Sequence, residues 1–116
     1  MTVKECYEVM KGDYDDVISR LRTDDRVKKF LLKVLDDTSF STLCKALEEK
    51  NIEEAFRAAH TLKGVCKNLS IDNLAYSASN LTEALRGRQD YGDDIDPLFK
   101  KVKKDYALTM ACIQML

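Results

Sequence analysis

The segment AAHTLKGVCKNL, residues 58–69, contains the single histidine of this 116-residue chain. His60 precedes Lys63 by three residues and Gly64 by four, so the three are neighbours on the surface of an α-helix. A neutral imidazole offers a nucleophilic ring nitrogen near physiological pH. A lysine attracts an anion, and a glycine leaves room for a bulky partner beside the ring. The spacing therefore predicts a site at which His60 carries a phosphoryl group.

The apolar pattern of this segment predicts a helix over residues 52–69 and places the histidine outside the core. The apolar stripe of the helix consists of Ile52, Ala55, Phe56, Ala59, Leu62, Cys66 and Leu69. At about 100° per residue, His60 lies roughly 120° from the centre of that stripe. Lys63 and Lys67 lie on the same side of the helix as the ring. Gly64 also faces outward, where packing inside the protein does not explain its helix-destabilising cost of about 1 kcal/mol relative to alanine.

Other kinds of catalytic site find little support in the sequence. A single histidine cannot supply a His/Asp or Ser/His/Asp arrangement, and the chain contains neither a GxxxxGK[ST] nor a GxGxxG loop. We therefore expect no ATP site, no autokinase activity and no cofactor bound by this chain. If His60 carries phosphate, the phosphate comes from one protein and goes to another. The predicted role is a carrier protein and not an enzyme.

Composition limits the classes of partner. The formal charge is −1, with 45% hydrophobic and 34% charged residues, which is typical of one globular domain and argues against a nucleic-acid-binding surface. No run of 18 apolar residues predicts membrane insertion. The four cysteines are isolated from one another, so they predict no metal site, and three of them fall on apolar stripes as buried thiols of a reducing compartment. We expect a cytoplasmic, monomeric protein that works as a free-standing shuttle.

The pattern of apolar residues predicts an all-α fold, because no alternating β-branched runs occur and the chain has only four glycines and one proline. Asn51 is the expected N-cap of the histidine helix, and Thr38 or Ser39 the expected N-cap after an earlier break. The expected fold is an antiparallel up-down four-helix bundle over residues 24–116, with residues 1–23 as a short helical extension packed on it. The predicted helices cover about 2–11, 14–21, 24–50 with a break at 36–39, 52–69, 71–87 and 94–113.

The segment AAHTLKGVCKNL resembles the A-H-x-[LI]-K-G pattern of the histidine-containing phosphotransfer (HPt) domains of two-component phosphorelays. The similarity extends over about residues 24–116. It implies a four-helix bundle in which His60 is phosphorylated at its outward nitrogen, Lys63 lies near the phosphoryl group, and Gly64 keeps the site open. The sequence departs from the family where two small residues and a second glycine are common, because Val65 and Ser70 stand there.

The same resemblance implies the partners. These are response-regulator receiver domains, which would supply Mg²⁺, and a sensor histidine kinase, which is often a hybrid kinase. In some members a polar side chain of the following helix holds the imidazole, and Thr82 or Ser79 is the corresponding residue here. Lys67 would help Lys63 to offset charge. Phe56 and the outer face of the 71–87 helix are expected to contact the partner.

Two other functions are compatible with a small helical protein. The first is an adaptor that binds a receiver or kinase domain without being phosphorylated, although such an adaptor has no need of the His60, Lys63 and Gly64 set. The second is a DNA-binding helical protein, which requires a basic stripe. The only basic cluster is KKVKK at residues 100–104, and it faces mostly solvent.

Overall fold

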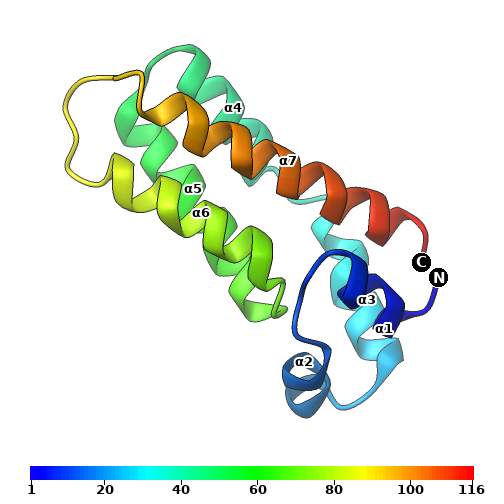
Figure 1. Ribbon diagram of the computed structural model, residues 1–116. Coiled ribbons are helices and arrows are strands. Elements are labelled where there is room, and N and C mark those ends of the chain that lie inside the picture. Colours follow the sequence, from blue (N-terminus) through cyan, green and yellow to red (C-terminus); the bar gives the residue numbers. More distant parts are fainter.

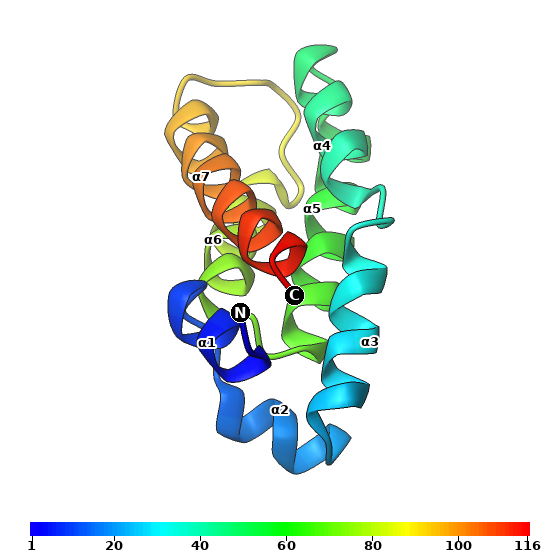
Figure 2. The same ribbon diagram turned by 90° about the vertical axis from the view of Figure 1, so that its right-hand side faces the viewer.

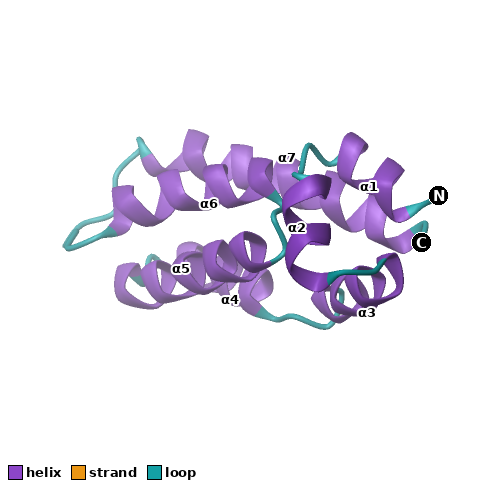
Figure 3. Ribbon diagram, turned by 90° about the horizontal axis from the view of Figure 1, so that it is seen from below, coloured by secondary structure: helices purple, strands orange, loops and turns teal.

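The computed structural model describes all residues from 1 to 116 and consists of helices and the turns between them (Figures 1 and 3). This confirms the prediction of an all-α fold. None of the helices combines the length and the apolarity needed to cross a membrane. The seven helices are α1 (Val3–Val9), α2 (Tyr14–Leu21), α3 (Asp24–Val34), α4 (Ser39–Glu48), α5 (Ile52–Asn68), α6 (Asp72–Leu85) and α7 (Ile95–Gln114).

The four helices α4 to α7 lie side by side and form the elongated body of the molecule (Figures 1 and 2). Helix α5 packs between α4 and α6, and α6 packs on α7. Helix α4 meets α7 through stacked aromatic rings, because the ring centroids of Phe40 and Tyr106 are 3.8 Å apart at an interplanar angle of 8°. The helix that carries His60 therefore has neighbours on two flanks, and His60 lies on its exposed face.

The core follows the apolar stripes that the sequence predicts. Its burial removes a continuous set of aliphatic side chains from water, which is the main driving force for folding. Cys6 and Cys66 are buried free thiols, as their apolar stripes predict. Cys44, which also lies on an apolar stripe, is only half-buried, and Cys112 is buried although the predicted stripe of the last helix does not include it. The largest fully buried side chains of α4 to α7 include Leu43, Leu62, Leu74, Leu81, Leu85, Ile95 and Ile113.

The break predicted at residues 36–39 separates two helices. Helix α3 ends at Val34, and α4 begins at Ser39 after a short turn. Thr38 occupies the N-cap position, as predicted, but its side chain forms no capping hydrogen bond. Asp37 takes that role, since its carboxylate accepts a hydrogen bond of 2.9 Å from the backbone N–H of Ser39. The apolar period located the break, but it did not identify the capping side chain.

The N-terminal helices pack at the end of the bundle where α5 turns into α6 (Figures 1 and 3). The Tyr7 hydroxyl donates a hydrogen bond of 2.6 Å to the carbonyl of Leu69. Ser70 turns the chain with a φ of 54°, in the left-handed region where a glycine is common. Its hydroxyl donates to Asp16 and accepts from Arg20, so α2 is tied directly to this turn.

Candidate functional site

Helix α5 positions the predicted site along one unbroken run of 17 residues. The predicted N-cap is confirmed, because the Asn51 side chain accepts a hydrogen bond of 3.2 Å from the backbone N–H of Glu54. Glu53 and Glu54 lie in the first turn, where the helix dipole favours negative charge. These features start the helix at a defined residue and fix the direction in which His60 points two turns later.

The His60 side chain is exposed, although its helical neighbours Ala59 and Leu62 are buried. The prediction that the ring lies outside the core is therefore confirmed. The imidazole packs beside the half-buried ring of Phe56, with the two centroids 6.0 Å apart and the planes at 11°. Phe56 thus supports one side of the imidazole at the protein surface.

Gly64 lies one turn after His60 and leaves open space. Apart from its two chain neighbours and the adjacent backbone of α5, a Cβ atom built at this position would meet no atom within 4 Å. No contact within the protein therefore requires a glycine here, although glycine is a poor helix former. The space beside the imidazole is available to a second molecule.

Positive charge surrounds this exposed part of α5. Lys63 is half-buried and Lys67 is exposed, and neither forms an ion pair. Arg57, one turn before His60, is instead paired with Glu53 at 2.5 Å. The two lysines therefore remain available to attract an anion near the ring.

Helix α6 adds an arginine and an acid that the sequence analysis did not predict. Arg86 donates two hydrogen bonds to the Glu83 carboxylate, at 2.9 and 3.2 Å, and its guanidinium carbon lies 5.0 Å from the centroid of the Phe56 ring. The hydrogen bond from Arg86 is the main cause that lowers the pKa of Glu83, and the positive charges of Arg86 and Lys63 lower it further. The contact of Arg86 with Phe56 shows that Glu83 and Arg86 lie on the side of α6 that faces α5. The sequence shows the spacing of Glu83 and Arg86, but it does not show which side of α6 faces α5.

Of the two hydroxyl residues proposed for this helix, Thr82 occupies another position. Thr82 is fully buried, and its hydroxyl donates a hydrogen bond of 2.7 Å to the carbonyl of Ala78 within α6. The structure therefore does not bring Thr82 to the imidazole. Ser79 is half-buried and precedes Glu83 by one helical turn. Glu83 and Arg86, the C-cap residue of α6, do approach the site: Arg86 lies over the Phe56 ring, and Glu83 binds Arg86.

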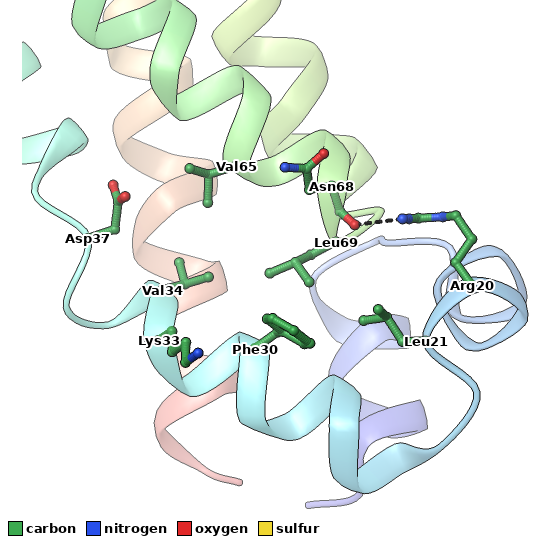
Figure 4. A pocket seen from close by; sticks show the side chains of 9 residues that line it. All are labelled: Arg20, Leu21, Phe30, Lys33, Val34, Asp37, Val65, Asn68 and Leu69. Atoms are coloured by element: carbon green, nitrogen blue, oxygen red, sulfur yellow. Dashed lines mark hydrogen bonds between the residues drawn. The ribbon is translucent and has the colours of Figure 1, made fainter.

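A separate groove lies at the end of α5, on the flank that faces α2 and α3 (Figure 4). Its volume is ≈ 410 Å³, and Arg20, Lys33, Asp37 and Asn68 supply its polar edge. Phe30 is 40% exposed at this groove. The groove contains no histidine, cysteine or hydroxyl side chain, so it offers mainly an apolar surface with a charged edge. Its apolar wall consists of Leu21, Phe30, Val34, Val65 and Leu69.

Comparison with known proteins assigns most of the chain to one family. A protein-family model described as "Hpt domain" matches residues 33–114, which is more than half of the chain. The match includes His60, Lys63, Gly64 and the two α6 residues Glu83 and Arg86. It begins after α1, α2 and most of α3. No curated protein and no solved structure matches the chain.

Proposed function

Because the chain belongs to the Hpt domain family, whose members take part in histidine phosphotransfer in two-component phosphorelays, we propose that His60 is its phosphorylated residue. The observation that carries this proposal is the exposed imidazole next to the open space at Gly64. An exposed nucleophile with clearance on one side suits a reaction in which a second protein must approach the ring. Lys63 and Lys67 supply positive charge on the same surface.

The proposed reaction moves one phosphoryl group between two proteins. The lone pair of the outward nitrogen of His60 attacks the phosphorus of a receiver domain's aspartyl phosphate. The N–P bond forms as the O–P bond breaks, and the aspartate leaves as a carboxylate. The same step in reverse phosphorylates the aspartate of another receiver. The transition state is loose and spreads negative charge over the phosphoryl oxygens, so Lys63 acts by offsetting charge, and the receiver supplies Mg²⁺.

The scaffold that we propose for this docking is an antiparallel up-down arrangement of α4 to α7. Short turns join α4 to α5 and α5 to α6, which brings consecutive helices side by side. A receiver domain would then contact α5 and α6 together, and the Phe56 ring would lie within the contact surface. We expect the protein to act as a monomer between a sensor histidine kinase and a response regulator.

The test uses a receiver domain that has been phosphorylated with a radioactive label. Wild-type protein should take up the label in an acid-labile, alkali-stable form, and His60→Gln should take up none while keeping the helical circular dichroism of the wild type. Lys104→Gln changes an exposed residue of α7 and serves as a control that should accept label at the wild-type rate. Label that persists on His60→Gln would refute the assignment.

The groove in Figure 4 favours one second candidate, an adaptor that binds a receiver or kinase domain without accepting phosphate. The same variant separates the two functions. An adaptor would bind its partner equally well as wild type and as His60→Gln, and neither protein would take up phosphate. A carrier would lose its phosphate acceptance in the variant.

A further inference from the structure

An acidic side chain lies in a site that is otherwise positively charged. Glu83 is exposed on α6, and two residues, Arg86 and Phe56, lie between it and the imidazole. It binds Arg86 through two hydrogen bonds, Arg86 lies over the face of Phe56 at 5.0 Å, and the Phe56 ring packs beside His60 at 6.0 Å. Because a cation over an aromatic face is itself a favourable contact, Arg86 is held in this position from both sides.

Phosphorylation of His60 would change the electrostatic interactions of Glu83 and Arg86. A phosphoryl group on His60 carries between one and two negative charges near neutral pH. It would attract Lys63 and Arg86, and it would repel Glu83. The Glu83 carboxylate therefore competes with the phosphoryl group for Arg86 and opposes it directly through charge repulsion.

We propose that Glu83 is a positioning residue that keeps phosphorylated His60 ready to give up its phosphoryl group. It does so by retaining Arg86 over Phe56 and by adding negative charge near the N–P bond. This inference rests on the proposed function of His60. In the loose transition state the phosphoryl group resembles metaphosphate, which carries less negative charge than the bound group. A nearby carboxylate therefore destabilises phosphohistidine more than it destabilises the transition state.

The expected size of the effect is moderate because the site is open to water. Two charges separated by about one Debye length, ~8 Å, interact weakly at the dielectric constant of an exposed site. Removal of the Glu83 charge and release of Arg86 should together lengthen the lifetime of phosphohistidine by about three- to tenfold. The effect should shrink in high salt, whereas a change in packing would not respond to salt in this way.

The experiment loads His60 with phosphoramidate, a small donor of phosphoryl groups to imidazole that requires no partner protein. The half-life of phosphohistidine is then measured by ³¹P nuclear magnetic resonance in wild type, Glu83→Gln and Glu83→Asp. Glu83→Gln should prolong the half-life by three- to tenfold at low salt, and Glu83→Asp, which keeps the charge, should remain close to wild type. The ratio between Glu83→Gln and wild type should fall toward one in 1 M NaCl.

Asp16→Asn is the matched control, because Asp16 also forms an exposed ion pair with an arginine but belongs to α2, away from the imidazole. It should leave the half-life unchanged. Equal half-lives for Glu83→Gln and wild type would overturn the inference, as would an equal effect of Asp16→Asn. If the protein accepts no label from a phosphorylated receiver, the proposed function fails, and the phosphoramidate experiment still decides the role of Glu83.

Discussion

The connection between α1 and α2 and the exposed face of α5 each contain a glycine, and the two glycines have opposite surroundings. A Cβ atom on Gly12 would lie 2.6 Å from the Tyr7 ring and 2.7 Å from the carbonyl oxygen of Ser70. A Cβ atom on Gly64 would meet nothing within 4 Å. The chain itself fills the space at Gly12, so packing explains that glycine. At Gly64 the space remains open, and the explanation lies with another molecule that approaches His60.

A bulky residue at Gly64 tests this comparison most strongly. Gly64→Gln should slow phosphotransfer from a receiver domain by about 100-fold, because a displacement of the reacting groups by about 1 Å has an effect of this size. The same variant should load normally with phosphoramidate, since this small donor needs no clearance. Its free energy of unfolding should rise by up to about 1 kcal/mol, because glutamine is a better helix former than glycine. Stopped-flow transfer, ³¹P spectra and urea unfolding measure the three effects.

Gly64→Ala provides the graded comparison for this prediction. A methyl group gives most of the gain in helix stability with little added bulk, so it should slow transfer less than glutamine does. Transfer at the wild-type rate in Gly64→Gln would show that the open space at Gly64 has no role in docking.

The opposite result is expected at Gly12. Gly12→Ala should lower the free energy of unfolding by about 1–3 kcal/mol, as overpacking in a well-packed region commonly does. The carbonyl oxygen of Ser70 belongs to the backbone and cannot rotate away from the added methyl group. Folded Gly12→Ala protein should still load with phosphoramidate and accept phosphate from a receiver. Urea unfolding of Gly12→Ala and Gly64→Ala gives the direct comparison, and a destabilisation of equal size in both would contradict it.

Lys63 tests whether the exposed face of α5 also contributes charge to the reaction. Lys63→Ala should slow transfer from a receiver by about three- to tenfold, because it removes one cation near the phosphoryl group in a site that water screens. Its urea midpoint should stay close to the wild-type value, since Lys63 forms no ion pair. Lys67→Ala, one turn further from the ring, should have a smaller effect on single-turnover transfer. An unchanged rate in Lys63→Ala would remove its proposed role.

The apolar period of a single helix determines which of its faces is buried, and this is why the exposure of His60 and the open position of Gly64 were predictable. The period does not determine how one helix is rotated against another. Glu83 and Arg86 were therefore missed, because their place beside Phe56 depends on how α6 packs on α5. A sequence shows their spacing along α6, but not the residues across the interface.

The position of Thr82 shows a second limit. A threonine in a helix is readily assigned to the solvent face, but this one is fully buried. Its hydroxyl is satisfied by the carbonyl of Ala78 one turn earlier, so burial leaves no unpaired polar group. The break before α4, in contrast, was predictable, because the interruption of the apolar stripe there is visible in the local sequence. Its capping residue, Asp37, was not identified.

The smallest predicted effect concerns the tie between α2 and the turn at Ser70. The hydrogen bond from Ser70 is the largest of the causes that lower the pKa of Asp16 below its ordinary value of 3.8, and Arg20 contributes as well. A carboxyl group with a lowered pKa in the folded state stabilises the fold above its unfolded pKa of about 3.9. That contribution is lost as the pH falls through the lower, folded pKa.

Asp16→Asn should therefore reduce the urea midpoint slightly at about pH 7, and the difference from wild type should narrow as the pH falls below about 4, because the wild type then loses its charge. Asp15→Asn changes an exposed neighbour without these hydrogen bonds and should leave the midpoint unchanged. Phosphate uptake from phosphoramidate should be normal in both variants, since Ser70 follows the C-terminal end of α5 and is separated from His60 by more than two helical turns. A difference between Asp16→Asn and wild type that stays constant from about pH 7 down to about pH 2 would show that the tie does not depend on the carboxylate charge. In that case shape alone would hold the N-terminal helices on the bundle, as the close approach at Gly12 does.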